Sequence, residues 1–316
     1  MDIVSKRAWF FLFSALIILP GVISLIIPPA LKPGIDFTSG AILDVTFAES
    51  VSEDDVRSEL TRLGHQEALI QKTGSRSVFV RTGILEEEVL REDGTVTSEQ
   101  TLIEEALNDN VAEIEFKEFD TVSPIVASET VRTAIIAVIV AAIGILAYVT
   151  WAFRGVPNPF RYGIAAIVAL IHDMLLIIGI FSILGKVINV EVNSMFIVGT
   201  LTVLGYSVND TIVVFDRIRE NVARNVDRPL PGIVNTSIME SIGRSLNTSF
   251  TTLFVLLALL LIGGPTIRDF LLVLAVGVVI GTYSSVCIAS QFLVVWDRGE
   301  IRKALRFLRL VPARST

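Results

Sequence analysis

Polar and charged residues interrupt otherwise apolar segments of this sequence at three places. His172-Asp173 lies in "IVALIHDMLLIIG", Asn209-Asp210 in "GYSVNDTIVVFDRIREN", and Arg244 in "IMESIGRSLNTSFTTLF". A charge at the centre of a bilayer costs at least about 2.5–3.5 kcal/mol on insertion scales, so such residues usually face a protein interior or a cavity. Their meaning therefore depends on whether these segments lie at membrane depth.

The composition predicts an α-helical polytopic membrane protein. Of 316 residues, 52% are hydrophobic and only 19% are charged, with a mean hydropathy of +0.67, which is more apolar than a soluble domain. A span needs about 20 apolar residues at 1.5 Å rise per residue. Six stretches qualify and predict six transmembrane helices: residues 9–27, 133–153, 160–184, 194–215, 238–262 and 270–296.

The first stretch resembles a signal peptide, since Lys6 and Arg7 precede an apolar run. It is long for a signal-peptide core, contains Pro20-Gly21, and ends without a small-x-small cleavage site. We interpret it as a retained signal anchor.

The uneven charge distribution predicts the orientation. Residues 31–130 hold 8 lysines and arginines against 22 acidic residues, whereas the rest of the chain holds 18 against 11. Basic residues gather in the N-terminus, two short connections and the tail: Lys6, Arg7, Arg154, Arg161, Arg217, Arg219, Arg224, Arg228, Arg298, Arg302, Lys303, Arg306, Arg309 and Arg314. The positive-inside rule then places both termini in the cytoplasm and the acidic domain outside. We favour topology determination over lipid or nucleic-acid binding for these basic residues.

Residues 31–130 alternate between strand and helix patterns and predict one extracytoplasmic α+β domain between the first and second transmembrane helices. Strand-like residues 41–47 are followed by a helix capped by Ser52, a hairpin through Gly74-Ser75, a helix capped by Ser98, and a last strand in "EIEFKEFDTV". Leu102, Ala106 and Leu107 form the apolar side of the second helix. The β-α-β-β-α-β order is typical of a ferredoxin-like unit.

Nothing in this sequence favours an enzyme. His65 follows a helix-ending glycine and is expected on the surface, and residues 85–97 are expected to form an exposed loop. Cys287 is the single cysteine, which excludes a disulfide within the chain and a cysteine cluster. We find no phosphate loop, metal-ligand spacing or nucleophile-base arrangement, and we predict no cofactor. The domains are therefore residues 1–30, 31–130, 131–297 and a basic cytoplasmic tail at 298–316.

Helix geometry groups the polar residues of the fourth and fifth spans. Residues three and four apart share a face, which places Arg244 with four polar neighbours: Glu240, Asn247, Thr248 and Thr251. In the fourth span, the corresponding side is Thr202, Gly205, Tyr206, Asn209 and Asp210. We expect Asp210 and Arg244 to lie at similar depth as an ion pair that protonation of Asp210 relieves, which suits a proton-driven device.

The alternative for any single polar residue in a span is a hydrogen bond that holds helices together. Several ionisable groups in three successive spans favour a proton relay instead. Asp173 as a structural partner and His172 as a core hydrogen-bonding residue both stay open. Gly277, Gly281 and Ser285 follow a four-residue repeat, and we interpret them as packing residues.

Several segments together resemble the SecF family, the smaller partner in the bacterial SecD/SecF translocation complex. They are "GIDFTSGAILDV", "ALIHD", "GYSVNDTIVVFDRIREN" and "SIMESIGRSLNTSFTTL". The resemblance covers essentially the whole chain. Ser39 stands where the family's glycine-rich motif usually has a second glycine, a small residue in place of another.

The resemblance implies half of a resistance-nodulation-division transporter in the bacterial cytoplasmic (inner) membrane. It implies proton-gradient coupling to late steps of polypeptide export, with a proton path through Asp210 and Arg244, assisted by Asn209. SecD is the implied partner, alongside the SecY/SecE/SecG channel, the SecA motor, YajC, membrane lipid and the translocating unfolded polypeptide, without nucleic acid. Protein export follows from the resemblance alone.

Two other functions remain as alternatives. In the first alternative, the chain is a subunit of a proton-driven exporter of small molecules or lipids in the same superfamily. In the second, it is an assembly factor that only stabilises neighbouring subunits. The small acidic domain lacks an apolar-aromatic cluster suited to a hydrophobic ligand, which argues against the exporter.

Overall fold

The structure is a computed structural model that describes residues 2–90, 96–225, 227–262 and 267–300. The chain divides into two compact units. The first joins Met1–Lys32 to Ile135–Thr316, and the second is Pro33–Ala134. We refer to them as the helical unit and the α+β unit.

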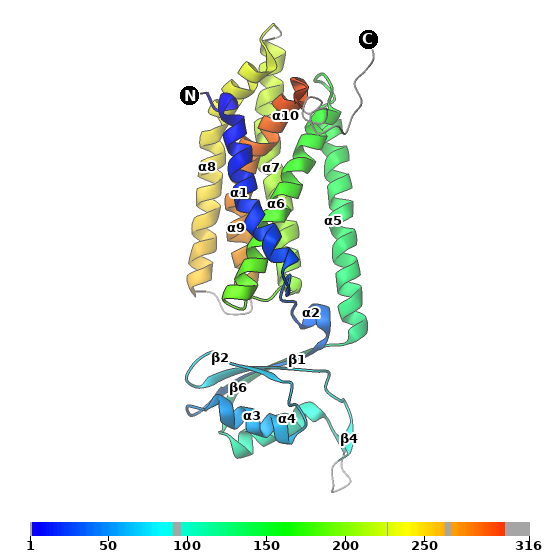
Figure 1. The fold of residues 1–316 in the computed structure, drawn as a ribbon, viewed down its shortest axis with the longest axis vertical. Coiled ribbons are helices and arrows are strands. Elements are labelled where there is room, and N and C mark those ends of the chain that lie inside the picture. The colour runs from blue at the N-terminus through cyan, green and yellow to red at the C-terminus, as the bar shows by residue number, and fades with distance from the viewer. Residues whose placement is uncertain (1, 91–95, 226, 263–266, 301–316) are drawn as a thin grey trace. The chain divides into compact units, whose positions relative to one another are not determined.

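The described residues contain six helical segments that are long and apolar enough to cross a membrane, as the sequence predicts. They are η1 (Val4–Lys6) with α1 (Arg7–Ile26), α5 (Pro124–Ala152), α6 (Phe160–Val187), α7 (Ser194–Arg224), α8 (Leu230–Ile262), and α9 (Arg268–Ser284) continued by the π-helical η3 (Ser285–Ala289) and α10 (Ser290–Asp297) (Figure 1).

Three helices continue about two turns or more beyond their predicted apolar stretches, and one of them, α5, begins at Pro124 rather than at residue 133. α7 runs on to Arg224, and α8 begins at Leu230 rather than at residue 238. Ion pairs at helical spacing support the polar extension of α7, Arg219 with Asp216 at 2.5 Å and Arg224 with Glu220 at 2.6 Å. Hydropathy marks only the part of a helix that suits hydrocarbon, so it misses such ends.

The two ends of the helical unit's described chain lie together. The backbone N–H of Ile3 donates to Asn235 Oδ1 near the start of α8 at 2.8 Å. Arg7 pairs with Glu300 at 2.5 Å, and Arg161 pairs with Asp297 at 3.4 Å. The ends predicted to be cytoplasmic therefore gather at one end of the bundle. Residues 301–316 of the predicted basic tail lie outside the described residues.

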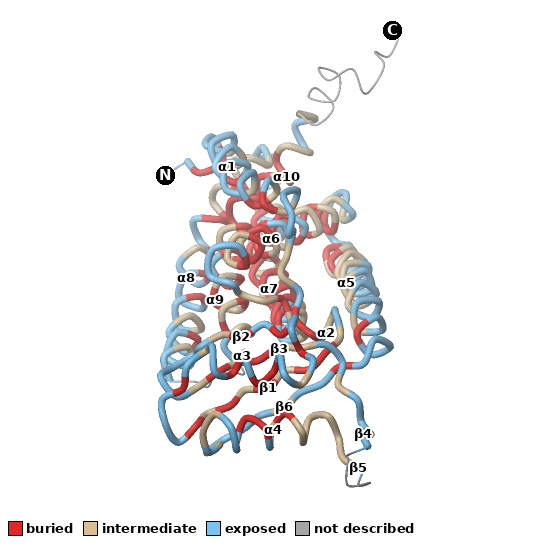
Figure 2. Tube along the Cα trace, turned by 60° about the horizontal axis from the view of Figure 1, so that its bottom comes forward, coloured by how far each residue is buried: buried red, intermediate tan, exposed pale blue. Residues whose placement is uncertain are grey.

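Burial in the helical unit concentrates in α6, α7 and the last span. Figure 2 shows the buried residues in red along these helices, while α5 and much of α8 are pale blue. α1 packs tightly on α6, because the Cβ that an alanine would add at Gly21 lies 2.8 Å from the Gly179 Cα. Ser24 and Ser182 are hydrogen-bonded across the same contact at 2.7 Å.

α5 packs only through its last turns within the helical unit. Val149 is buried, and a Cβ on Gly163 of α6 would approach Thr150 Oγ1 to 2.6 Å. Earlier residues of α5 expose their apolar side chains: Ile135, Ile136, Ile139, Val140 and Ile143. Most of this helix therefore has an apolar surface that the described chain leaves uncovered.

The α+β unit contains a four-stranded antiparallel sheet in the order β2-β3-β1-β6. The strands are β1 (Gly40–Phe47), β2 (Leu69–Lys72), β3 (Ser77–Thr82) and β6 (Ile114–Val122), and the helices are α2 (Ile35–Thr38), α3 (Glu53–Arg62) and α4 (Glu99–Asn110). Ser52 and Ser98 cap α3 and α4 by accepting hydrogen bonds from the N–H groups of Asp54 and Thr101. The predicted strands and helices of this unit are confirmed.

Two elements of this unit differ in detail from the predictions. Ile103, rather than Leu102, joins Ala106 and Leu107 in the core. The predicted loop at residues 85–97 contains a short antiparallel pair, β4 (Val89–Leu90) and β5 (Val96–Thr97). Residues 91–95 of that loop lie outside the described residues.

His65 is buried, so its predicted place on the surface is wrong. Gly64, at φ +98°, turns the chain back after α3, and the His65 N–H then donates to the Leu60 carbonyl at 2.9 Å. The ring consequently lies inside, with Nδ1 3.1 Å from Thr82 Oγ1 and Nε2 3.2 Å from a Glu99 carboxylate oxygen.

Candidate site: two buried carboxylates in the helix bundle

Small residues on α9 allow this helix to approach α7 closely. A Cβ on Gly277 would lie 2.2 Å from a methyl of Val203, and a Cβ on Gly281 would lie 3.0 Å from the Ser207 Cβ. The next member of this repeat, Ser285, donates a hydrogen bond to Asp210 Oδ2. The repeat therefore brings a hydroxyl to a carboxylate as well as serving packing, which extends its predicted role.

Asp210 points into the bundle and is only 8% exposed. Its carboxylate accepts a hydrogen bond from Ser285 at the start of η3, and the same hydroxyl lies 3.1 Å from the Thr282 carbonyl. A hydroxyl donor next to a buried carboxylate compensates part of the cost of removing the charge from water.

Asp173 on α6 is fully buried and has three polar neighbours. Ser207 donates to Asp173 Oδ2 at 2.5 Å, Ser284 donates to the same oxygen at 2.8 Å, and His172 Nδ1 lies 3.0 Å from Oδ1. Hydroxyls from α7 and from the last span thus converge on one carboxylate of α6.

Two consecutive serines in the last span each donate a hydrogen bond to one of the two carboxylates. Neighbouring residues of a helix point about 100° apart, so Ser284 reaches Asp173 on α6 while Ser285 reaches Asp210 on α7. The helix widens into a π-turn from Ser285 onward, and the Ser290 hydroxyl donates to the Ser285 carbonyl at 2.8 Å. Single π-turns occur frequently at functional sites.

His172 extends this polar cluster toward α1. It is 7% exposed, and its ring centroid lies 6.1 Å from that of Tyr283. The Tyr283 hydroxyl donates to the Phe10 carbonyl at 2.9 Å and lies 3.0 Å from Ser14 Oγ. Within the described residues, His172 Nε2 is buried without a hydrogen-bond partner.

The structure does not join Asp210 to Arg244. Asp210 faces the bundle interior, whereas Arg244 is exposed on α8, and no ion pair links them in the described part of the chain. The remaining polar residues predicted near Arg244 are also exposed: Asn209, Glu240, Asn247, Thr248 and Thr251. Asn209 and Asp210 are adjacent, and the boundary between the inner and outer faces of α7 passes between them.

Two further predicted residues bond within the chain. Glu240 accepts hydrogen bonds from Arg217 Nε at 2.7 Å and Asn221 Nδ2 at 2.8 Å. Tyr206 is half-buried, and its hydroxyl lies 3.1 Å from Ser249 Oγ. These contacts join α7 to α8.

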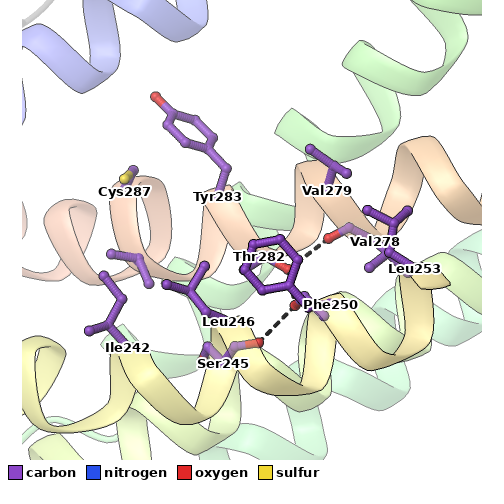
Figure 3. Close-up of a pocket in the computed structure, with 12 residues that line it drawn as sticks. Ile242, Ser245, Leu246, Phe250, Leu253, Val278, Val279, Thr282, Tyr283 and Cys287 are labelled. Carbon is purple, nitrogen blue, oxygen red and sulfur yellow. Dashed lines mark hydrogen bonds between the residues drawn. The ribbon is translucent and has the colours of Figure 1, made fainter.

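A pocket of about 330 Å³ lies between α8 and the last span. Figure 3 shows it surrounded by Leu246 and Phe250 of α8 and by Val278 and Tyr283 of α9. Its lining is almost wholly apolar, and it touches neither of the carboxylates. It therefore borders the polar site through Thr282 and Tyr283 without reaching the carboxylates.

The hydroxyls of the site were not predicted. Sequence reasoning selected Asp173, Asp210 and His172, but it omitted Ser207 and Ser284 and assigned Ser285 to packing alone. The available signal was that serines at 207, 284 and 285 recur near small residues within spans. Serine is common at helix contacts in membranes, so that signal alone does not select a site.

Among the described residues, no cluster of three metal-ligating side chains occurs.

The fold and the site define a class of protein: a polytopic membrane protein with six apolar spans, a small α+β unit after the first, and hydroxyl-bonded carboxylates inside the bundle. A family model described as "Protein export membrane protein SecD/SecF, C-terminal" matches residues 102–299. The chain belongs to the SecD/SecF family.

Individual relatives agree with the family. The chain is 42% identical to the protein translocase subunit SecF of Thermobaculum terrenum over 97% of both chains. It is 39% identical to that of Anaerolinea thermophila over 96% of both chains. It is 34% identical to the protein translocase subunit SecDF of Bacillus subtilis, where it covers 39% of the relative's length.

Solved structures of SecDF proteins have the same fold. The crystal structure of SecDF from Thermus thermophilus, described as a translocon-associated membrane protein, is 31% identical and has a TM-score of 0.76 over 94% of this chain. A SecDF structure in a super-membrane-facing form is 30% identical with a TM-score of 0.62. The chain spans 39% and 40% of those two solved chains.

Proposed function

We propose that this chain is the SecF half of a SecD/SecF complex and couples the proton gradient to late steps of polypeptide translocation, as a non-enzymatic accessory subunit of protein export. The observation that carries the coupling is Asp210, a buried carboxylate on a spanning helix with a hydroxyl donor. A buried carboxylate at membrane depth is costly, and such residues typically mark ion or proton pathways.

The outer polar face of α7 and α8 supports SecD as the partner. Asn209 and Arg244 are exposed on spanning helices, and α5 exposes an apolar surface. Exposed polar groups would be costly against hydrocarbon, whereas a second set of helices with a carboxylate would satisfy them. The Bacillus subtilis relative is named SecDF, which combines SecD and SecF, and it is more than twice as long as this chain. In this arrangement Arg244 pairs across the interface rather than with Asp210.

We further propose that both termini lie in the cytoplasm and that the α+β unit, with a ferredoxin-like order of elements, lies outside the cytoplasmic membrane. The gathering of the described chain ends at one end of the bundle supports this topology. The lysines and arginines that gather in the N-terminus and in the connections after the second and fourth spans support the same topology.

Replacing Asp210 tests the coupling. Asp210→Asn keeps the volume of the side chain and removes its titratable group, so we expect gradient-stimulated export into membrane vesicles to fall to the level seen without a gradient. The matched control is Asp216→Asn, on the same helix but exposed and paired with Arg219, which should export normally. Normal gradient stimulation in Asp210→Asn, at equal protein level, would refute the coupling.

Co-purification from native membranes tests the complex. A SecD-like chain should be recovered with the full-length protein, and Arg244→Leu should reduce that recovery or the gradient-stimulated export. An outer-membrane channel recovered in place of SecD would instead identify the exporter alternative.

A further inference from the structure

Two consecutive serines each lie between a buried carboxylate and a backbone carbonyl. The Ser285 hydroxyl can donate to Asp210 Oδ2 or to the Thr282 carbonyl at 3.1 Å. The Ser284 hydroxyl can donate to Asp173 Oδ2 at 2.8 Å or to the Gly281 carbonyl at 3.2 Å. Both serines are fully buried, so water does not replace either partner.

A serine hydroxyl has one proton to donate and two lone pairs to accept with. Next to an ionised carboxylate, its single proton points to the carboxylate oxygen. When that oxygen takes up a proton, the new acid O–H donates to the serine oxygen, and the serine proton turns to the carbonyl three residues earlier. The two states differ by one added proton and one rotated hydroxyl, with every other covalent bond unchanged.

We propose that Ser285 and Ser284 are positioning residues for proton uptake, and that they stabilise both protonation states of Asp210 and Asp173 within one backbone conformation. This inference deepens the proposed coupling function and rests on it for its biological role. It also assigns Asp173 to the same proton-responsive cluster as Asp210, which the sequence left open.

The arrangement of the helices supports this assignment. Ser207, which donates to Asp173, lies on α7 one turn before Asp210, so α7 and the last span each contact both carboxylate environments. Direct ion pairs would favour one protonation state only. Among the described residues, no lysine or arginine forms an ion pair with Asp173 or Asp210.

Other titratable groups lie on the helices that pack around the two carboxylates. α6 contributes His172, whose Nδ1 lies 3.0 Å from Asp173 Oδ1. The last span contributes Tyr283 and Cys287, beside the two serines in sequence. Arg244 of α8 lies on the exposed face of that helix, and within the described chain no charged side chain of α1 or α10 forms an ion pair with either carboxylate.

The test uses the full-length protein in its native complex and follows the carboxylic acid band of Asp210 by infrared difference spectroscopy as a function of pH. Asp210→Asn identifies the band. In Ser285→Ala both protonation states lose a hydrogen bond, but the bond to the charged carboxylate is the stronger of the two, so we expect the midpoint of protonation to rise by about 1 pH unit. Ser285→Thr keeps the hydroxyl and should restore the midpoint.

Ser241→Ala is the matched control, since Ser241 is also a buried serine of a spanning helix but its hydroxyl donates to the backbone carbonyls of Ser237 and Ile238. Its midpoint should equal that of the unmodified protein. If Ser285→Ala does not accumulate, Ser285→Cys, similar in size and a weak donor, should raise the midpoint in the same direction. Ser284→Ala should shift the corresponding band identified by Asp173→Asn.

The outcomes separate this inference from the proposed function. An unchanged midpoint in Ser285→Ala, or an equal shift in Ser241→Ala, overturns the inference even if Asp210→Asn abolishes gradient-driven export. A shifted midpoint together with normal export by Asp210→Asn supports the hydroxyl switch and refutes the coupling function.

Discussion

Gly277→Ala tests the close packing of α9 on α7 that positions the site. The added Cβ would lie 2.2 Å and 2.5 Å from the two methyl groups of Val203. Val203 is fully buried, and a β-branched side chain in a helix holds essentially one rotamer, so it cannot turn away. Because carbon atoms pack at about 3.5–4.0 Å, the helices must separate by on the order of 1 Å.

The expected cost combines two opposing effects. Overpacking a tight contact destabilises a protein by about 1–3 kcal/mol. Replacing a helical glycine by alanine stabilises the helix by about 0.8–1.0 kcal/mol, because alanine has the higher helix propensity. Because an approach of 2.2 Å is a severe overlap, we take the upper part of the first range, about 2–3 kcal/mol, and expect a net loss of about 1–2 kcal/mol in the free energy of unfolding. In a unit of this size that loss lowers the melting temperature by about 2–8 °C.

The single cysteine of the sequence supplies the assay. Cys287 is buried in the last span, so a thiol-reactive fluorescent dye reports its exposure when the purified protein is heated in detergent. Gly243→Ala on α8 is the matched control, because its added Cβ would meet nothing within 4 Å. That variant should melt at or above the temperature of the unmodified protein.

A second substitution makes the test specific. Val203→Ala removes the two methyl groups, so it should cost less in the Gly277→Ala background than alone, with a coupling of about 0.5–3 kcal/mol. Equal melting temperatures for Gly277→Ala and Gly243→Ala, or strict additivity with Val203→Ala, would show that the two helices do not pack as described.

Two further predictions concern the α+β unit. Burial and the facing carboxylate of Glu118 raise the pKa of Asp44 above 3.8, so its charge opposes folding at neutral pH, and that penalty disappears as the pH falls below this value. Asp44→Asn should therefore increase the protection of β1 amides from hydrogen exchange at pH 7 by about 0.2–1 kcal/mol. It should have no effect on this protection near pH 3. An equal effect at both pH values would contradict this explanation. Ser98→Ala removes the cap that accepts from the Thr101 N–H, so α4 amides should lose about 1 kcal/mol of protection, whereas unchanged exchange would show that the cap contributes nothing.

Local patterns predicted the secondary structure well because their causes are local. Ser52 and Ser98 begin α3 and α4 where capping predicts, and long apolar runs become spans. His65 shows the limit, since its burial depends on the turn at Gly64 and on side chains of β3 and α4. Those partners are distant in sequence, so a local pattern does not reveal them.

The candidate site was predicted in part. Asp173 and Asp210 are recognisable because a carboxylate in an apolar run is unusual wherever the helix packs. Which residue faces it is a different question. Ser285 reaches Asp210 because Gly277 and Gly281 bring α9 close to α7, and Ser284 reaches Asp173 because the last span also packs on α6. Both contacts are set by the packing of the helices.

The sequence by itself determined six spans, their polar interruptions and the family. Only the tertiary structure decided that Asp210 faces inward while the adjacent Asn209 and the more distant Arg244 face outward. The physical reason is that a membrane helix is apolar toward both lipid and neighbouring helices, so hydrophobic periodicity does not distinguish its two faces. The direction of each polar residue is then fixed by the contacts of the folded bundle.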